Sequence, residues 1–334
     1  PVSIRPNRMK CSQPVEGESI PWASSGTYLK NRPTFTFDPL FHAGCYYVQE
    51  ASSMFVEKVL QEYVKDPVVM LDLCAAPGGK STLCRGVLPE GSLLVANEVM
   101  RNRSQILAEN LIKWGHPEVV VTNNDPADFT DLTHLFDVIL TDVPCSGEGM
   151  FRKDQVAVDE WSLENVDICW KRQRRILADI WPALKPGGIL IYSTCTFNRE
   201  EDEDNVAWIA KELDADILSV PVEDSWGITG NLTGKDFPVY RFLPHKTKGE
   251  GFFLGVLKKR GDVLDETPRR FLKTSARLDK KKKGKDAKQT LVVPKEAKVW
   301  LEDSLEYALA MKDTNVVAFP KAYENEYALL QQTL

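Results

Sequence analysis

Short apolar runs alternate with longer segments whose apolar residues recur at helical spacing through most of the chain. Predicted strands cover residues 68–73, 93–97, 118–122, 137–141 and 188–193, a segment near residue 217, and residues 252–257. Predicted helices cover residues 49–65, 81–88, 101–114, 163–184 and 199–213. Apolar strands separated by helices are typical of a sheet with helices on both faces. The pattern therefore predicts an α/β fold with a mainly parallel, doubly wound sheet.

The two ends of the chain show different patterns. Residues 1–50 are rich in turn-forming Pro and Gly, and we expect a small lead-in of short strands before a main domain over 51–260. Residues 261–290 hold a run of lysines and predict a basic linker. Residues 291–334 regain enough apolar content for part of a small α+β domain. Because the chain begins at Pro1 rather than Met, further residues are expected to precede it.

Polar or reactive residues stand where the predicted strands end. The carboxyl ends of parallel strands meet at one edge of a sheet, which is where doubly wound folds bind their ligands. These ends carry Asp72 with the loop to Lys80, Asn97-Glu98, Asn124-Asp125, Asp142 with the nearby Cys145, and Ser193-Thr194-Cys195. Such residues gathered at one edge predict a functional site.

Composition limits the classes of protein. A net charge of −6 argues against a wholly basic surface, although a local basic channel remains compatible with it. Seven cysteines without a Cys-x-x-Cys pair predict neither a disulfide framework nor a zinc site, and they favour a reducing compartment. No apolar run is long enough to span a membrane, and no signal-peptide core is present. We therefore expect a cytoplasmic protein with no metal site and no membrane contact.

The loop over residues 72–80, Asp-Leu-Cys-Ala-Ala-Pro-Gly-Gly-Lys, first suggests a phosphate cradle. With Ser81 it matches the end of the triphosphate-binding motif G-x-x-x-x-G-K-[ST], and residues 138–142 would supply the acid that holds magnesium. However, Cys74 stands where the leading Gly belongs, and Pro77 removes an N–H from the loop. A nucleoside triphosphatase is therefore disfavoured.

A nucleoside cofactor without a triphosphate fits this segment better. Glu98 closes the second strand, where an acid accepts hydrogen bonds from both ribose hydroxyls, and Asp125 closes the third, where it would accept from an adenine amino group. The dinucleotide fingerprint G-x-G-x-x-G is absent. S-adenosylmethionine satisfies these positions.

Cys145 and Cys195 follow two neighbouring strand ends, beside Asp142. A buried cysteine is commonly structural, but two at this edge favour chemistry. Cytosine C5 is a poor nucleophile until a thiolate adds at C6, after which C5 can attack an electrophilic methyl group. Asp142 is the candidate for the contact to cytosine N3, and a base must then take the C5 proton. Spacing alone leaves open which cysteine attacks.

Three motifs occur in order: the loop at 72–80, Asp-Val-Pro-Cys-Ser-Gly at 142–147 and Ser-Thr-Cys at 193–195. Together they resemble the Nol/Nop/Sun family of RNA cytosine-C5 methyltransferases, over residues 1 to about 260. Segments 41–53, 147–153 and 249–253 look like its bacterial small-subunit ribosomal RNA branch. The resemblance implies a Rossmann-like, S-adenosylmethionine-dependent methyltransferase that methylates cytosine C5 in RNA, foremost 16S ribosomal RNA, through a covalent cysteine–C6 adduct.

The resemblance also implies roles for residues. Cys195 would be the nucleophile, Cys145 would assist release of the methylated product, and Lys80 would help to position the carboxylate at the cytosine. The cofactor pocket would be lined by Cys74, Ala75, Ala76, Pro77, Gly78, Gly79, Lys80, Glu98, Asp125 and Asp142. The lead-in would bind RNA, in ribosomal RNA or the small ribosomal subunit. A transfer RNA methyltransferase and a non-catalytic RNA-binding assembly factor remain as alternatives.

Two further groups have simpler interpretations. The acids at 200–203 are expected to favour the dipole in the first turn of a helix rather than to bind a metal. Arg172, Arg174 and Arg175 predict an exposed helix face with some phosphate contact. The opposite face should bury Ile168, Ile176, Leu177 and Ile180.

Overall fold

The computed structural model describes residues 1–11, 15–261, 293–301, 306–312 and 314–334. The chain divides into two compact units, Pro1–Val263 and Leu264–Leu334, each of which is described by itself. Apart from Gly261, the predicted basic linker lies outside the described residues.

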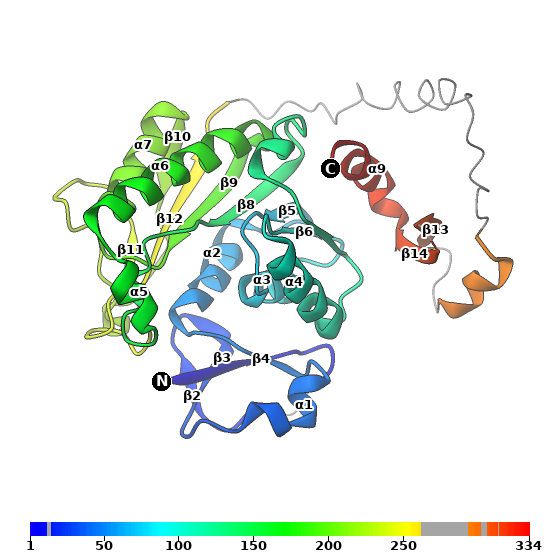
Figure 1. The fold of residues 1–334 in the computed structure, drawn as a ribbon, viewed down its shortest axis with the longest axis horizontal. Coiled ribbons are helices and arrows are strands. Elements are labelled where there is room, and N and C mark those ends of the chain that lie inside the picture. Colours follow the sequence, from blue (N-terminus) through cyan, green and yellow to red (C-terminus); the bar gives the residue numbers. More distant parts are fainter. Residues whose placement is uncertain (12–14, 262–292, 302–305, 313) are drawn as a thin grey trace. The chain divides into compact units, whose positions relative to one another are not determined.

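An eight-stranded sheet forms the centre of the first unit (Figure 1). Its main strands, from one edge to the other, are β10 (Ala215–Leu218), β12 (Phe252–Lys259), β9 (Leu184–Thr194), β8 (Phe136–Asp142), β5 (Val69–Asp72), β6 (Leu93–Asn97) and β7 (Val119–Thr122). The short β11 (Tyr240–Phe242) pairs with β12. Strands β5 to β9 are parallel, and β12 is antiparallel to β9 and β10. The predicted α/β sheet is therefore confirmed.

Helices cover both faces of this sheet because its strands are apolar on both sides. The helices of the first unit are α1 (Pro39–His42), which lies in the lead-in, and α2 (Phe55–Tyr63), α3 (Gly79–Val87), α4 (Arg101–Trp114), α5 (Gln155–Glu160), α6 (Leu163–Ile180) and α7 (Glu203–Glu212). Ile191 of β9 lies in the same apolar core as α2 and α3. The next residue, Tyr192, points to the opposite face, where its hydroxyl lies 3.2 Å from Gln173 Oε1 of α6 and accepts from Asn205 of α7.

The lead-in folds into a four-stranded antiparallel sheet. Its strands, in spatial order, are β2 (Glu18–Ile20), β3 (Ala23–Leu29), β1 (Val2–Pro6) and β4 (Tyr46–Val48). The buried guanidinium of Arg5 donates to Thr82 Oγ1 of α3 at 2.6 Å, and the Tyr47 hydroxyl lies 3.4 Å from the carbonyl oxygen of Pro77. The lead-in therefore packs against the loop that joins β5 to α3.

Three local expectations were wrong or incomplete. The helix expected over 163–184 ends at Ile180, because Pro182 has no N–H to donate and its ring disfavours the preceding helical turn. Ile168, which was expected on the buried face of this helix, is instead 46% exposed. The buried residues of α6 are Val166, Cys169, Gln173, Ile176, Leu177 and Ile180. The short elements α5 and β11 carry too few residues to show a period and were not predicted.

In the second unit, the described residues form a hairpin and a helix. Strands β13 (Tyr307–Lys312) and β14 (Asn315–Pro320) pair antiparallel, and α9 (Glu324–Thr333) follows them. The rings of Phe319 and Tyr327 stack with their centroids 4.3 Å apart, which joins the hairpin to the helix. This unit has the mixed α+β character expected from its composition.

Candidate active site

The parallel register of β8 and β9 brings two cysteines together. Asp142 at the end of β8 pairs with Ser193 near the end of β9, so the loops that follow them run side by side. The sulfur atoms of Cys145 and Cys195 lie 2.9 Å apart, and the Cys195 N–H donates to Cys145 Sγ at 3.4 Å. Both are partly buried free thiols. Two thiols therefore meet at the carboxyl edge of the sheet.

A lysine–carboxylate pair also lies at this edge of the sheet. Lys80 Nζ lies 2.7 Å from Asp142 Oδ2, and Ser193 Oγ donates to Asp142 Oδ1 at 2.8 Å. Burial lowers the pKa of Lys80, but the negative charges of Asp142 and Asp72 more than offset this, so the pKa is raised above its ordinary value. Lys80 therefore stays charged and holds the Asp142 carboxylate in one orientation.

The loop over residues 73–78 is held from several sides. Gly78 has a φ of +113°, a left-handed conformation that glycine adopts without a steric penalty. The carbonyl oxygen of Ala76 accepts from Arg103 at 2.9 Å, and that of Pro77 accepts from Asn110 at 2.8 Å. Burial raises the pKa of Cys74, so its thiol stays neutral. The predicted loop residues thus form one ordered segment that ends at Lys80.

Asp72, which precedes this loop, is completely buried. Ser81 Oγ donates to its Oδ2 at 2.6 Å, while Oδ1 has no hydrogen-bond partner among the described residues. Burial raises the pKa of Asp72 to about 7, whereas an unfolded aspartate titrates near ~3.9. The native state therefore binds a proton that the unfolded state releases between these two pH values.

This difference predicts a pH-dependent stability. As the pH rises from about 5 to about 8, the free energy of unfolding should fall by about 2–3 kcal/mol more in the wild type than in Asp72→Asn, which cannot ionise. Urea unfolding at both pH values measures this difference. Exchange of the exposed Asp66 for Asn is the control, and it should keep the wild-type pH dependence. An equal pH dependence in Asp72→Asn and the wild type would contradict the prediction.

The other two predicted cofactor residues also lie at strand ends. The buried Glu98 follows β6, accepts from the Met100 N–H at 3.0 Å and pairs with Arg103 at 3.3 Å. Asp125 follows β7, where it caps a short 3₁₀ turn and pairs with Arg175 at 3.3 Å. Both carboxylates are on the edge that carries the 72–80 loop, and their cofactor contacts stay predictions.

Of the four acids at 200–203, Glu203 lies in the first turn of α7 as expected, whereas the other three precede the helix and Asp202 makes no capping hydrogen bond. The Asp202 Oδ1 atom accepts from Thr194 at 2.6 Å and from Thr196 at 3.0 Å, the two residues that flank Cys195. The guanidinium of Arg241 lies 3.0 Å from Asp202 Oδ2 and donates to Glu203 Oε1 at 2.7 Å. All three charged side chains are at most 2% exposed. Arg241 supplies the counter-charge that allows Asp202 and Glu203 to be buried. Asp202 can therefore hold the loop that carries Cys195.

Two more buried carboxylates join the two cysteine loops reciprocally. Glu148, after Cys145, accepts from the N–H groups of Phe197 and Asn198 at 2.6 and 2.9 Å. Glu201, after Cys195, accepts from the N–H of Ser146 at 3.1 Å. Each loop therefore supplies a carboxylate that binds the backbone of the other. We call this arrangement of Glu148 and Glu201 the carboxylate clasp.

The sequence analysis did not find Glu148, Glu201 or Arg241 as residues of the site. Arg241 carried a usable signal, because it stands between the apolar residues Tyr240 and Phe242 in a run of strand-forming residues. A charged residue inside such a run indicates a buried partner. The two glutamates carried no comparable signal.

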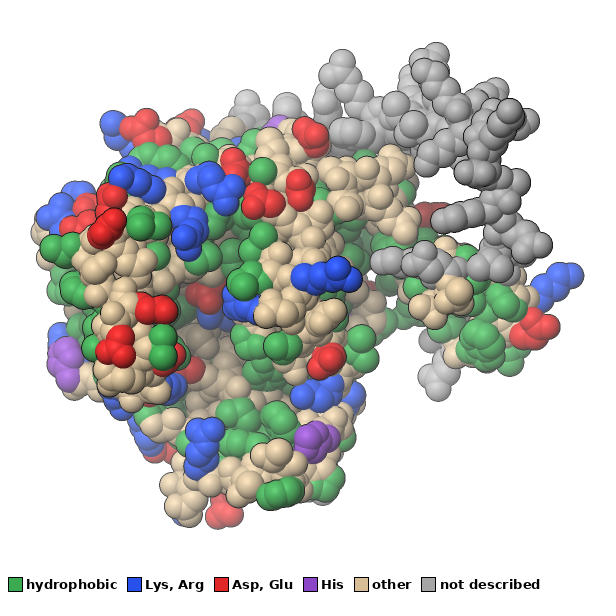
Figure 2. All heavy atoms as spheres, in the orientation of Figure 1, with side chains coloured by type: hydrophobic (Ala, Val, Ile, Leu, Met, Phe, Trp, Pro, Cys, Tyr) green, Lys and Arg blue, Asp and Glu red, His purple; other side chains and the backbone are tan. Residues whose placement is uncertain are grey.

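The described residues contain no cluster of His, Cys, Asp and Glu side chains that could hold a metal ion. None of the helices in the described parts of the chain is long and apolar enough to cross a membrane. On the visible face of the first unit, acidic and basic side chains are intermixed (Figure 2).

Two family models match the chain. Residues 59–258 match the model described as 16S rRNA methyltransferase RsmB/F, and residues 1–51 match the N-terminal domain of 16S rRNA methyltransferase RsmF. The chain is 35% identical to ribosomal RNA small subunit methyltransferase F of Pectobacterium atrosepticum, over 78% of this chain and 57% of that protein. It is 31% identical to the protein of the same name from Vibrio cholerae, over 96% and 70%. The chain thus spans little more than half the length of the first of these relatives.

Two solved structures from Pyrococcus horikoshii are similar to the chain. A methyltransferase homolog protein superposes with a TM-score of 0.66 at 29% identity, over 78% of this chain and 86% of that one. NSun6, solved with SFG, superposes with a TM-score of 0.60 at 29% identity, over 69% and 57%.

Proposed function

Because the chain belongs to the 16S rRNA methyltransferase RsmB/F family, we propose that it methylates C5 of a cytosine in 16S ribosomal RNA, with S-adenosylmethionine as the methyl donor. The observation that carries this proposal is the pair of thiols 2.9 Å apart, with Asp142 and Lys80 at the same sheet edge. A ribosomal RNA substrate also implies action in the cytoplasm.

The residues present fit S-adenosylmethionine better than a nucleotide triphosphate. The Glu98, Asp125 and Asp142 carboxylates at the strand ends would repel phosphates, but they can accept hydrogen bonds from nucleoside hydroxyl and amino groups. The 72–80 loop and these acids would hold the cofactor, which supplies an electrophilic methyl group when bound. Pro77 offers no N–H to a phosphate.

The environment of the two thiols favours Cys195 as the nucleophile. Hydrogen bonding to Cys195 and burial together raise the pKa of Cys145 well above its ordinary value, so Cys145 keeps its proton and can donate it to the Cys195 sulfur. Negative charge on the Cys195 sulfur is thereby stabilised. Cys195 then adds to cytosine C6, and Cys145 is placed to take part in its release after methyl transfer.

Asp142 is the group proposed to contact cytosine N3, which takes up a proton from water as the thiolate adds at C6, so that the N3–H donates to the Asp142 carboxylate. Ser193 and Lys80 each bind one of its oxygens, so the carboxylate cannot rotate away from the base. The Lys80 ammonium, paired with Asp142, would help to balance negative charge that develops on the pyrimidine when the thiolate adds.

Methyl transfer to RNA tests the proposal directly. The chain should transfer tritiated methyl groups from S-adenosylmethionine to 16S ribosomal RNA, offered as a transcript and as small subunits, and bisulfite sequencing should locate 5-methylcytosine. Cells that lack the gene should lose the same modification. Transfer RNA and ATP are the comparison ligands. Methylation confined to transfer RNA, or tight binding of ATP with none of S-adenosylmethionine, would refute the proposed function.

A further inference from the structure

An aromatic pocket lies beside the loop that carries Cys195. Its cavity has a volume of about 360 Å³ and is lined by Phe151, Trp161, Phe197, Glu148 and Asn198. Phe197 and Asn198 follow Cys195 by two and three residues. Neither the two cysteines of the pair nor Asp142 lines the cavity. A group bound there is therefore distinct from the base that Cys195 attacks.

The walls of this pocket are held in place before any ligand arrives. Trp161 Nε1 donates to Glu148 Oε1 at 2.9 Å, and Phe151 meets the Trp161 ring edge-to-face with centroids 6.4 Å apart. The Asn198 amide donates to Glu201 at 2.8 Å. In contrast, Phe151 remains 38% exposed. The pocket thus has an aromatic wall that is held in place and is still partly accessible.

Backbone contacts couple this pocket to the nucleophile. The Gly149 N–H donates to the Cys195 carbonyl oxygen at 2.7 Å, and Glu148 accepts from Phe197 N–H at 2.6 Å. Glu148 and Gly149 therefore bind the Cys195 loop, and Phe151 shortly after them belongs to the pocket wall. A ligand in the pocket lies at a fixed position relative to the Cys195 sulfur.

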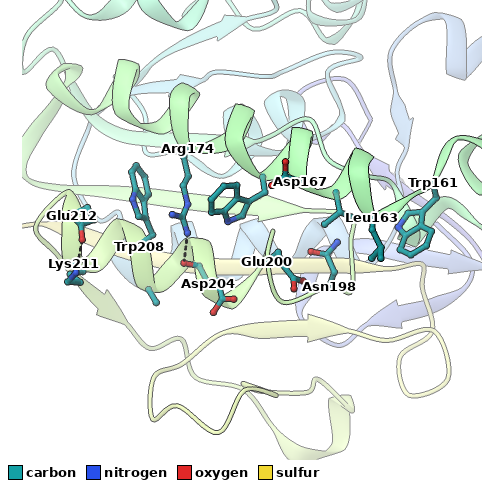
Figure 3. A pocket seen from close by; sticks show the side chains of 13 residues that line it. Trp161, Leu163, Asp167, Arg174, Asn198, Glu200, Asp204, Trp208, Lys211 and Glu212 are labelled. Atoms are coloured by element: carbon teal, nitrogen blue, oxygen red, sulfur yellow. Dashed lines mark hydrogen bonds and ion pairs between the residues drawn. The ribbon is translucent and has the colours of Figure 1, made fainter.

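Charge limits what can enter the pocket. Arg152 and Lys153 follow Phe151 and share one buried carboxylate, Glu250, at 3.7 and 3.5 Å, so the pair keeps a net positive charge, and their side chains are 53% and 45% exposed. Beyond Trp161 and Asn198 a larger groove of about 550 Å³ continues between α6 and α7 (Figure 3). Its charged residues are Asp167, Glu200, Asp204, Glu212, Arg174 and Lys211, and this excess of acids would repel a phosphate backbone. The aromatic pocket therefore suits an uncharged ring such as a nucleobase, and the exposed basic side chains of Arg152 and Lys153 suit the phosphates attached to it.

We propose that this pocket receives the base of a nucleotide next to the target cytosine in single-stranded RNA, stacked on Phe151 and Trp161, with Arg152 and Lys153 at the phosphate. Unpaired bases stack on aromatic side chains, and basic residues follow their backbone. The inference rests on the proposed function, because an RNA substrate is assumed, and it adds a site that fixes the nucleotide beside the reacting one.

Ultraviolet crosslinking of a 16S ribosomal RNA transcript to the full chain tests this site without requiring catalysis. Mass spectrometry should find nucleotide adducts on Phe151, Trp161 or Phe197. The Phe151→Ala variant should lose most of them, while Met150→Ala, a neighbouring residue of equal 38% exposure that does not line the pocket, should keep them. Adducts elsewhere with none on these three residues, or equal losses in the two variants, would overturn the inference.

Methylation kinetics provide the second measurement. Phe151→Ala should raise KM for the transcript by roughly 5- to 100-fold, the loss expected for one base–aromatic stack, and leave KM for S-adenosylmethionine unchanged. Met150→Ala should change neither of these two KM values. An unchanged KM for RNA in Phe151→Ala would contradict the proposed site. The two proposals fail separately: a transcript and subunits that gain no 5-methylcytosine refute the function, whereas missing adducts refute the pocket.

Discussion

Replacement of Cys195 by Ala should abolish methyl transfer, with a loss of at least about a thousandfold in rate, because it removes the proposed nucleophile and leaves Cys145 for the separate role in release. The Cys145→Ala variant should instead accumulate a covalent RNA–protein adduct, since Cys195 can still attack while release is impaired. Denaturing gel electrophoresis after incubation with S-adenosylmethionine and 16S ribosomal RNA should show the adduct as a band of lower mobility.

The control for these variants is Cys45→Ala. Cys45 is also a partly buried free thiol, but it lies in the lead-in, away from the strand ends. Its exchange should leave methylation intact and give no adduct. Normal turnover by Cys195→Ala would refute its assignment as the nucleophile. An adduct in Cys195→Ala and none in Cys145→Ala would reverse the two roles.

Loss of the Arg241 guanidinium should produce the largest change in stability. Arg241→Met is expected to lower the free energy of unfolding by about 3–5 kcal/mol, because Asp202 and Glu203 are then left buried without a counter-charge. Urea unfolding measures the change. The variant should also lose methylation at temperatures where it stays folded, since Asp202 holds the residues on both sides of Cys195.

The matched control is Arg260→Met. Arg260 also pairs with two carboxylates, Asp214 and Asp216, but its side chain is 53% exposed. Its loss should cost no more than about 1 kcal/mol. Adding Asp202→Asn and Glu203→Gln to Arg241→Met should restore part of the stability, because the uncompensated charges are removed. Equal losses in Arg241→Met and Arg260→Met would contradict this account.

Periodicity predicted the fold well because most strands of the sheet are buried on both faces. Predicted β6 and α4 match the observed bounds at both ends. The family expected from the three motifs is confirmed as well. Because the motifs fall at the carboxyl ends of strands, the sequence also predicted one shared edge, but neither the strand order nor the side-chain pairing across strands follows from it. The thiol distance depends on the register between β8 and β9, and the Lys80–Asp142 contact depends on the register between β5 and β8; spacing along the chain gives neither.

The acids at 201–203 show why the remaining errors occurred. In the sequence they stand in the first turn of a predicted helix, which is where acids favour the dipole. The partner of Asp202 and Glu203 is Arg241, which lies about 40 residues further along the chain on a strand too short to recognise. Local pattern rules describe contacts within one element, whereas a buried charge is paired by whichever element packs over it. For the same reason the roles of Glu148 and Glu201 emerge only in three dimensions.

The carboxylate clasp limits the sequence changes that the two cysteine loops can accept during evolution. Because Glu148 and Glu201 each bind the backbone of the opposite loop, a substitution that reshapes one loop leaves the carboxylate of the other without its partner. We therefore expect the sequences of the two loops to change together during evolution. A chimera that takes only residues 142–148 from a relative should lose methylation activity. A chimera that takes residues 193–203 from the same relative as well should regain it.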